Sequence, residues 1–444
     1  MLLTFAKGGI HPDENKLTSL KKTEVLPAPA LVSIPVSQHL GAPATILVEK
    51  NSKVKIGQLI ASGNGFVSAN IHASVSGTVQ KIDEIIDSSG YKRKAIIIKT
   101  EGDEWMDGID TSITLIKDIT LTPDEIVRKI TDAGIVGLGG ATFPSHVKLK
   151  VPIGKKADIL LINGVECEPY LTSDHRVMLE YTHELLVGIQ LLMRALQVEK
   201  AIIGIENNKP DAIALLQKES KLYSGILVKA LKVKYPQGGE KQLIKALIKR
   251  EVPSGGLPID VGTVVHNVGT ALAVYFAVQK NKPLIERVVT ITGKSLTKPG
   301  NYWVRFGTSV TVLVEAAGGL PNDTGKIING GPMMGKSIGL LDVPITKGTS
   351  GIVIIPRTQA QREPVQPCIR CAQCVTVCPM GLEPYLLMNL AEHKFWERSE
   401  NEQIMDCIEC GSCSFTCPSA RPLLDYIRLG KSETLKRIRA RKTV

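Results

Sequence analysis

Cysteine is rare in this chain, and eight of its nine cysteines fall in two copies of one pattern. Both copies read C-x2-C-x2-C-x3-C-P. The first copy contains Cys368, Cys371, Cys374 and Cys378, and the second contains Cys407, Cys410, Cys413 and Cys417. Three closely spaced thiolates can bind three irons of a [4Fe–4S] cubane, while the fourth thiolate, next to proline, reaches the neighbouring cluster. The repeat therefore predicts two clusters that exchange their fourth ligands.

This exchange assigns four cysteines to each cluster. The first cluster takes Cys368, Cys371, Cys374 and Cys417, and the second takes Cys407, Cys410, Cys413 and Cys378. Zinc is the alternative, because paired C-x2-C sequences also form tetrahedral zinc sites. A zinc site leaves the third cysteine and the Cys-Pro step of each copy unexplained. Residues 383–406, between the copies, have helical apolar spacing, so we expect a helical pair that separates the two motifs in a module carrying single electrons.

Length and composition limit the rest of the chain. Its 444 residues suggest about three domains, and 43% hydrophobic with 22% charged residues is typical of a soluble globular protein. The longest apolar run, 271–278, is far shorter than the roughly 20 residues of a membrane helix. The start lacks a secretory signal, so we expect the protein to stay in the cytoplasm.

The charge balance of this chain is basic: 54 Lys and Arg against 43 Asp and Glu give +11. Aromatic residues make up only 4% of the chain, which leaves little material for stacking on nucleic-acid bases. We therefore expect no nucleic-acid partner. The densest positive stretch is the C-terminal tail, with Lys436, Arg437, Arg439, Arg441 and Lys442. A short helix there would suit an anionic partner or lipid headgroups, and a disordered, solvated end is the alternative.

Residues 43–80 alternate short β-rich runs with Gly and Asn turns. They resemble the biotinyl and lipoyl carrier domains, which are small barrel-sandwiches. Those carriers place a lysine at a hairpin tip, whereas the tip here, Ser68 to Asn70, has none. The segment is therefore expected to be a structural docking module and not a swinging arm.

From residue 121 the pattern becomes α/β. A helix is expected to start at a Thr122–Glu125 capping signal and to end at Gly134. Buried strands at 157–164 and 200–206 alternate with helices at 182–197 and 210–220, which predicts a mostly parallel sheet. After Pro283, two strands, a turn and a helix suggest a β-grasp fold. We expect a multidomain α/β protein with a barrel-sandwich docking domain, a Rossmann-like ligand-binding domain, a β-grasp domain and a helical two-cluster domain with a basic tail, at residues 1–115, 116–283, 284–356 and 357–444.

A glycine-rich loop follows the expected helix. Its glycines, Gly137, Gly139 and Gly140, would let the backbone approach a phosphate closely, and Lys148 follows. A plain turn is the alternative. The loop also departs from the usual dinucleotide fingerprint, because a helix precedes it where that fingerprint has a strand.

The next segment, 160–176, adds polar residues at the carboxyl end of a buried strand. These residues are Asn163, Glu166, Glu168, Asp174 and Arg176. Ligands bind at this edge of an open α/β sheet. With the glycine loop, this segment resembles the flavin subunit of respiratory complex I, which has a G-x-G-G-x-x-F-P loop, a downstream lysine and an N-x-x-E-x-E-P segment. Two later segments, YPQGGEKQLIKAL and VVHNVGTALAV, resemble that subunit's nicotinamide-side and flavin-contacting segments, in the same order.

The resemblance implies a site for FMN and NAD(H). The FMN phosphate would be held by Gly137, Gly139, Gly140, Lys148, Asn267 and Thr270. The flavin ring would be oriented by Asn163, Glu166 and Glu168, with Glu166 as the catalytic residue. NAD(H) would meet Phe143, Gly238, Gly239 and Glu240. The acidic residues could instead be solvated or helix-capping carboxylates, Phe143 could be a core residue, and Cys167 is expected to be an inert buried thiol.

Several features depart from that subunit. Leu138 stands where its loop has Arg, Thr142 stands where it has Gly, and its single cluster motif has a different spacing. A barrel-sandwich, a two-cluster module and the starting motif GGIHPDENK instead resemble the RnfC family, a component of the Rnf ion-translocating electron transport complex. This resemblance implies a peripheral subunit at the cytoplasmic face of the membrane. Its partners would be the other subunits, NAD(H) and, through the complex, ferredoxin.

A flavin is needed to pass electrons between the nicotinamide and the iron–sulfur clusters. Nicotinamide exchanges a hydride, which carries two electrons, whereas a cluster moves one electron, and a flavin can do both. Two alternatives remain open. One is a soluble NAD-linked dehydrogenase that donates to free ferredoxin, and the other is an electron-wiring subunit without flavin.

Overall fold

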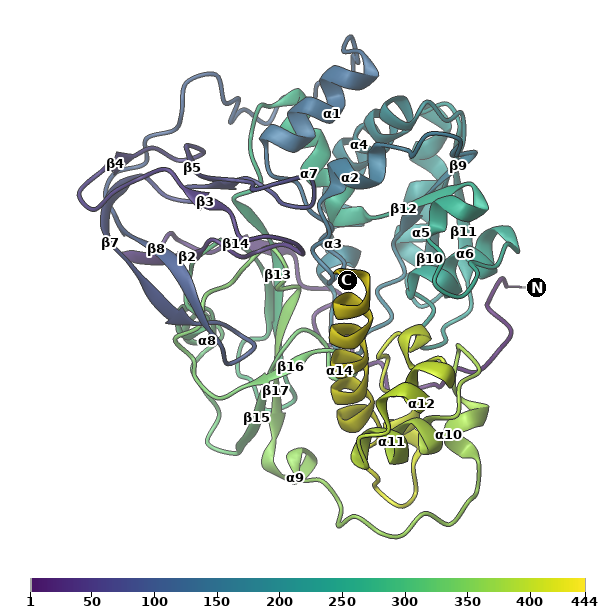
Figure 1. Ribbon diagram of the computed structural model, residues 1–444. Helices are drawn as coiled ribbons and strands as arrows, with labels where there is room; N and C mark the ends of the chain where they lie inside the picture. Colours follow the sequence, from purple (N-terminus) through teal and green to yellow (C-terminus); the bar gives the residue numbers. More distant parts are fainter. Residues whose placement is uncertain (1, 444) are drawn as a thin grey trace.

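A four-stranded parallel sheet organises the middle of the chain (Figure 1). Its order is β11-β10-β9-β12, with bounds Ile226–Leu231, Ala201–Glu206, Ile159–Asn163 and Thr263–Asn267. Helices α4 (Thr182–Leu196) and α7 (Val268–Gln279) pack in the core on one face, and α6 (Glu240–Ile248) packs in a second core. The computed structural model describes residues 2–443. The expected parallel α/β architecture is confirmed.

Helix α1 (Pro123–Asp132) forms where the sequence signals place it. Thr122 and Glu125 form a reciprocal capping box, which satisfies two backbone N–H groups at the start of the helix. The helix ends before Gly134, whose φ is +63°. A Cβ at Gly134 would stand 2.2 Å from the carbonyl oxygen of Asn70, so only glycine fits this close approach.

The barrel-sandwich consists of two small sheets around a shared apolar core. One sheet has the order β2-β8-β7-β4 and the other β3-β5-β6, with bounds Leu31–Pro35, Lys92–Thr100, Gly77–Ile86, Lys53–Val54, Thr45–Ile46, Leu59–Ser62 and Ile71–His72. Its hairpin tip packs against the Rossmann-like domain. Asn70 Nδ2 donates to the Asp132 carbonyl at 3.1 Å, and His146 Nε2 lies 3.0 Å from the Phe66 carbonyl.

The third sheet has six strands in the order β1-β14-β13-β17-β15-β16. The strands have the bounds Thr23–Val25, Gly300–Arg305, Glu286–Thr292, Gly351–Pro356, Thr324–Asn329 and Lys336–Ile338, and α8 spans Val310–Ala316. Strand β1 pairs in parallel with β14 and thus lies outside the barrel-sandwich. The expected domain boundary of 1–115 stays a prediction, and within it β1 joins the sheet of the β-grasp domain. The free edge of β14 accepts backbone hydrogen bonds from a segment that local sequence patterns do not mark as a strand.

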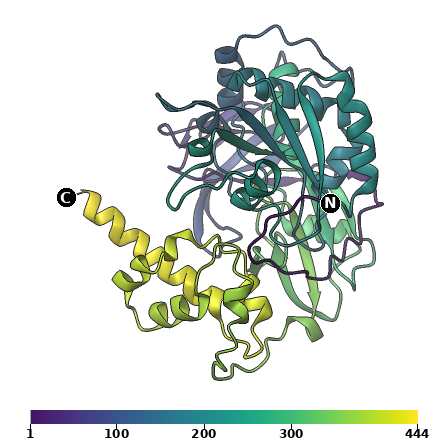
Figure 2. The same ribbon diagram turned by 90° about the vertical axis from the view of Figure 1, so that its right-hand side faces the viewer.

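The C-terminal domain is helical. Its helices are α10, α11, α12, α13 and α14, with bounds Gln373–Thr376, Pro384–Glu392, Trp396–Asn401, Ser412–Thr416 and Leu423–Thr443. Helices α11 and α12 are the expected pair between the cysteine motifs. Figure 2 shows this domain below the rest of the molecule, with the end of α14 projecting outward. None of the helices within residues 2–443 is both long enough and apolar enough to cross a membrane.

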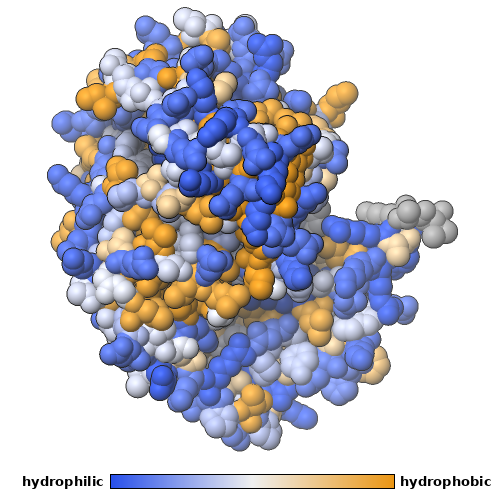
Figure 3. Space-filling model, turned by 90° about the vertical axis from the view of Figure 1, so that its left-hand side faces the viewer, coloured by the Kyte–Doolittle hydropathy of each residue, from blue (hydrophilic) through white to orange (hydrophobic). Residues whose placement is uncertain are grey.

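The surface of the molecule carries polar and apolar side chains intermixed. Figure 3 shows hydrophilic side chains over most of one face, with apolar side chains gathered in smaller areas between them. The distribution on this face is that of a folded domain with a solvated exterior.

Candidate functional site

The carboxyl edge of the parallel sheet brings the predicted segments together. Asn163 ends β9, and its Nδ2 donates to the Gly238 carbonyl at 2.9 Å. Thr270, in the first turn of α7, accepts a hydrogen bond from the Leu138 N–H at 2.9 Å through its hydroxyl. The glycine loop, the 235–240 segment and the start of α7 therefore meet at one edge, although the sequence separates them by up to about 130 residues.

Gly139 and Gly140, the last two glycines of the loop, are exposed. The three atoms nearest to a Cβ on Gly139 would all belong to the Asn267 side chain, at ordinary contact distances of 3.4 to 3.7 Å. A Cβ on Gly140 would meet nothing within 4 Å, although its φ of +128° itself favours glycine. Packing does not demand glycine at position 139, and the space before the loop is open. This open backbone fits an anionic phosphate.

Lys148 and Glu240 form an ion pair beside this loop. Lys148 Nζ lies 2.7 Å from Glu240 Oε1 and 3.0 Å from the Val265 carbonyl. Both side chains are partly exposed, at 28% and 40%. A surface pair of this kind contributes about 0–1 kcal/mol. A bound phosphate can therefore replace Glu240 as the partner of Lys148 at little cost.

Glu166 caps a helix. Its φ is +47°, and its carboxylate accepts hydrogen bonds at the start of α3 (Ser173–Glu180). The donors are the N–H groups of Asp174 and His175, at 2.7 and 3.1 Å, and the Ser173 hydroxyl at 3.3 Å. A carboxylate is stabilised at this positive end of a helix. The helix-capping alternative raised for the acidic residues thus describes Glu166, and its catalytic role stays a prediction.

Glu168 links the Rossmann-like domain to the β-grasp domain. Its carboxylate accepts hydrogen bonds from the N–H groups of Met333 and Met334, at 3.1 and 2.8 Å. A Cβ on Gly331 would stand too close to Glu168 Oε2, at 2.1 Å, so glycine is required there. Burial raises the pKa of Glu168 to about 7. Glu168 therefore anchors the 330–335 loop.

Asp174 is tied directly to Asn267. Its Oδ2 accepts a hydrogen bond from Asn267 Nδ2 at 2.6 Å. Burial, and then repulsion by Glu166, raise the pKa of Asp174 to about 7. The sequence places Asp174 at the sheet edge but gives it no role, because its partner lies 93 residues further along. This protonatable carboxyl borders the candidate flavin site.

Two lysines that sequence reasoning missed hold the 165–171 loop by its backbone. Lys209 Nζ donates to the Val165 carbonyl at 2.7 Å, and burial lowers the pKa of Lys209 to about 8. Lys16 Nζ donates to the carbonyls of Glu166, Glu168 and Leu171, at 2.8, 2.9 and 2.7 Å. Lysine in an extended stretch carries no local signal of such a role.

Phe143 and Gly239 are also part of this edge. The Gly137 N–H donates to the Phe143 carbonyl at 2.9 Å, which closes the glycine loop, and the Phe143 ring is half-buried. Gly239 precedes α6, and a Cβ there would stand 2.6 Å from Gln242 Oε1. Contacts of these residues with a nicotinamide stay predictions.

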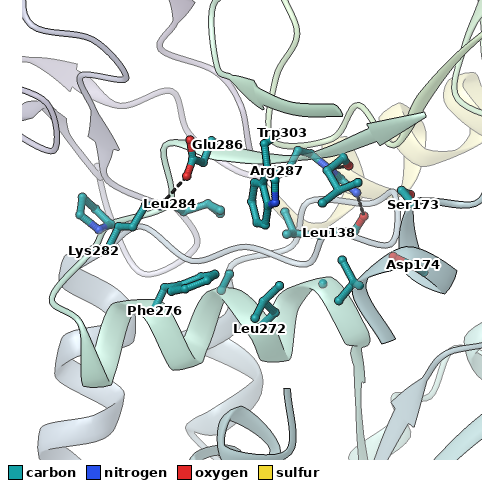
Figure 4. Close-up of a pocket in the computed structure, with 15 residues that line it drawn as sticks. Leu138, Ser173, Asp174, Leu272, Phe276, Lys282, Leu284, Glu286, Arg287 and Trp303 are labelled. Atoms are coloured by element: carbon teal, nitrogen blue, oxygen red, sulfur yellow. Dashed lines mark hydrogen bonds and ion pairs between the residues drawn. The ribbon is translucent and has the colours of Figure 1, made fainter. Parts of the chain in front are cut away.

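A narrow apolar crevice lies beside this edge, between α7 and the β13–β14 strands (Figure 4). Apolar side chains line much of it, among them Leu272, Phe276, Leu284 and Trp303, and Ser173 and Asp174 lie at one end in the view. None of the residues predicted for FMN or NAD(H) lines it. The crevice therefore adjoins the candidate site without containing it.

The assignment of four cysteines to each cluster stays a prediction, and the electrostatics of the thiols bear on it. Burial, and then the thiols of Cys417 and Cys368, raise the pKa of Cys374. Burial and the thiols of Cys407, Cys410 and Cys378 raise the pKa of Cys413 to about 12. These effects of Cys417 on the first motif and of Cys378 on the second are in line with the expected exchange of fourth ligands. No group of three or more Cys, His, Asp or Glu side chains within residues 2–443 is arranged to hold a single metal ion.

The fold and these sites define a class: a modular electron-transfer protein with a flavin-type α/β domain and a dicluster domain. Family models agree. They describe an RnfC barrel sandwich hybrid domain, a Nuo51 FMN-binding domain, an SLBB domain and a 4Fe-4S dicluster domain, which match residues 4–103, 130–276, 288–337 and 360–418. The chain belongs to the RnfC family, whose members are subunits of ion-translocating ferredoxin:NAD(+) oxidoreductase complexes.

Two relatives illustrate this membership. The relative from Clostridium ljungdahlii, a subunit of a proton-translocating ferredoxin:NAD(+) oxidoreductase complex, is 48% identical, over 98% of this chain and 94% of the relative. The relative from Acetobacterium woodii, a subunit of a Na(+)-translocating complex, is 43% identical, over 97% of each chain. Among solved structures, an NAD+-reducing [NiFe]-hydrogenase has a TM-score of 0.51 at 20% identity, over 69% of this chain and 61% of that chain. That likeness concerns the fold alone.

Proposed function

We propose that this chain passes electrons between NAD(H), FMN and two [4Fe–4S] clusters, as a peripheral subunit of a membrane ion-translocating ferredoxin:NAD oxidoreductase complex. One observation carries the proposal: the four flavin-type segments meet at the sheet edge, and the cluster domain packs against the same edge. There the Tyr235 hydroxyl, in the 235–240 segment, donates to the Cys410 carbonyl at 2.8 Å.

Different residues at the sheet edge bind the two cofactors. The bare backbone at Gly139 and Gly140, with Lys148 and the start of α7, binds the phosphate of FMN. FMN, when bound, supplies the exchange between hydride and single electrons. Asn163 holds the 238–240 backbone in place through its hydrogen bond to Gly238. NAD(H) would contact this 238–240 backbone, and Glu240 would then give up its ion pair with Lys148.

The acidic residues orient the site. Glu166 keeps α3 in place, and α3 presents Asp174 to Asn267. Burial, and then repulsion by Glu166, raise the pKa of Asp174, which favours its protonated form. Glu166 therefore acts on the flavin site mainly through the residues that it positions.

The partners follow from membership of the family. Relatives are named as subunits of multi-subunit complexes, so the other subunits are the direct partners of this chain. Ferredoxin is reached through the complex. The chain lies at the cytoplasmic face of the membrane, where NAD(H) is available.

The FMN and iron contents of the purified chain test the proposal. After anaerobic purification we expect one FMN and about eight irons per chain, because two cubanes hold four irons each. NADH should bleach the flavin absorbance. Clusters without flavin would favour the electron-wiring alternative, and rapid NADH-dependent reduction of free ferredoxin by the isolated chain would favour a soluble dehydrogenase.

A further inference from the structure

The N-terminal segment 3–18, which we term the strap, joins the two redox domains. Figure 2 shows it running along the boundary between the α/β domain and the cluster domain. Leu3 bridges to Leu231, at the outer strand of the parallel sheet. Ile10 and Tyr235 exchange two backbone hydrogen bonds, each of 2.9 Å. The strap contains the GGIHPDENK motif, to which the proposed function assigns no role.

The glycines of the strap lie against a cluster ligand. The Gly9 N–H donates to the Val377 carbonyl at 2.8 Å, next to Cys378. Gly8 has a φ of +66°, and a Cβ there would stand 2.5 Å from the carbonyl carbon and oxygen of Cys378. Only glycine permits this backbone contact.

The other end of the strap holds the flavin-side loop. Lys16 donates to three carbonyls of the 166–171 stretch, within 2.9 Å. The Tyr170 N–H donates to the Glu14 carbonyl at 2.8 Å, and Glu14 Oε2 accepts from Asn208 Nδ2 at 2.8 Å. One short segment therefore fixes both the loop that bears Glu166 and the backbone of Cys378.

The two cluster sites differ in their surroundings. Tyr235 and Cys410 are buried in one apolar group, with Ile10, Cys167, Met333, Val377 and Ile408. In contrast, Cys368 and Cys371 are exposed, as is the whole stretch 361–373. The second-motif cluster thus faces the flavin-side segment, and the first-motif cluster is open to solvent at Cys368 and Cys371.

We propose that the strap seats Cys378, Cys407, Cys410 and Cys413 against the flavin-type edge, so that the cluster these residues would hold, the inner cluster, would exchange electrons directly with a bound flavin. The cluster of Cys368, Cys371, Cys374 and Cys417 then exchanges electrons with the partner subunit. This order rests on the proposed function. One hydride carries two electrons and a cluster takes one, so the oxidation of each NADH would need two successive one-electron transfers through the inner cluster. Both electrons would pass to the partner subunit, and the flavin's protons would return to water.

Two cysteine variants test the order by EPR after mixing with NADH. In Cys371→Ser, which removes the outer cluster, NADH should still give the signal of a reduced cluster. In Cys407→Ser, which removes the inner cluster, NADH should bleach the flavin while the remaining cluster stays oxidised, although dithionite reduces it. The opposite pattern, or NADH reduction of the outer cluster alone, overturns the order.

Substitutions in the strap test its role in chains that should keep both clusters. Gly8→Val should speed amide exchange at Gly9, Ile10 and Tyr235 about tenfold, because overpacking opens their hydrogen bonds. Flavin and iron contents should stay near those of the parent, while reduction of the inner cluster slows. The matched control is Gly339→Val, since Gly339 is exposed and a Cβ there meets nothing within 4 Å.

Lys16→Met tests the other end of the strap. It should slow reduction of the inner cluster and shift the flavin absorbance spectrum, while Lys22→Met, at an exposed position, should change neither. Unchanged exchange in Gly8→Val overturns the seating role. A wild-type chain that binds no flavin overturns the proposed function instead, and hydrogen exchange alone then decides whether the strap seats the cluster domain.

Discussion

Gly139 and Gly140 are neighbours, yet glycine is required at only one of them by backbone geometry. Gly140 has a φ of +128°, so its replacement would strain the backbone. Gly139 lies outside the left-handed region, and the three atoms nearest to a Cβ there belong to Asn267, at 3.4 to 3.7 Å. A substitution at Gly139 therefore tests whether a ligand binds against the loop, whereas a substitution at Gly140 would also strain the backbone of the turn.

We expect Gly139→Val to yield a folded chain with both clusters and with FMN content reduced by about tenfold or more, since bulk against a phosphate costs about a kcal/mol or more. NADH should no longer reduce the clusters, and a small chemical reductant should still do so. Flavin fluorescence after denaturation and iron analysis measure both contents. The open position Gly339→Val serves as the control, and full flavin occupancy in Gly139→Val would make the loop an ordinary turn.

Glu168 gives a prediction about pH. Its pKa is raised from 4.5 to about 7 by burial, so between these values the folded chain keeps a proton that the unfolded chain has lost. This contribution to stability is complete below the unfolded pKa of 4.5 and is lost as pH rises through about 7. The free energy of unfolding of the wild type, minus that of Glu168→Gln, should therefore fall by on the order of 3 kcal/mol as pH rises across this window. Urea unfolding across a pH series measures it, and the exposed Glu49→Gln should show no such trend.

At the scale of elements, the cysteine motifs and their helices determine which cluster a substitution damages. Cys378 follows α10 and is buried, and its thiol raises the pKa of Cys413 in the other motif. We expect Cys378→Ser to damage the cluster of Cys407, Cys410 and Cys413, as seen in a changed EPR signal for that cluster. Loss of the Cys368-side cluster alone would contradict the exchange of fourth ligands.

Helix α14 includes the basic tail, and contact of the tail with an anionic partner stays a prediction. The tail continues α14 to Thr443, so the helix is longer than expected. Arg437 is exposed, while Lys436 pairs with Glu433 at 2.6 Å and Arg441 pairs with Glu400. The side chain of Lys442 lies outside the described residues.

Removing residues 436–444 should weaken attachment to the membrane complex. Because exposed charges are screened by salt, the difference between the full-length and truncated chains should be largest at low ionic strength and should shrink as salt is added. Co-purification with the membrane fraction across a salt series measures it. Equal retention of the full-length and truncated chains would exclude the tail as an attachment site.

At the scale of the whole molecule, one lysine ties three domains together. Lys347 of the β-grasp domain is buried, and its Nζ donates to the carbonyls of Asn70 and Gly134, at 2.8 and 2.7 Å. Its own N–H donates to Gln38 Oε1 at 3.1 Å. The glycine loop begins at Gly134, so this junction also supports the flavin site.

Lys347→Met should leave two buried carbonyls without a donor, at a cost of about 1–3 kcal/mol for each group. We expect a lower melting temperature and faster proteolysis between the barrel-sandwich and the α/β domain. The exposed Lys294→Met is the control. An unchanged melting temperature and digestion pattern in Lys347→Met would show that apolar packing alone holds the junction.

The sequence by itself determined the features that depend on neighbours along the chain. Two cysteine motifs, the Thr122–Glu125 cap, the alternation of strands and helices and the glycine loop all follow from local spacing. The resemblance of four ordered segments then indicated which residues gather at the sheet edge, and the hydrogen bonds from Asn163 to Gly238 and from Leu138 to Thr270 bring these segments together.

The tertiary structure alone decided what each polar group does there. Glu166 caps α3, Glu168 holds a loop of another domain, and Lys16 reaches across 150 residues to their backbone. The strap is extended and has no periodic pattern, so nothing local marks it as the contact between Cys378 and the flavin-side loop. The reason is physical: helix and strand signals come from residues a few positions apart, whereas a buried charge or a close backbone contact is set by whichever domain packs against it.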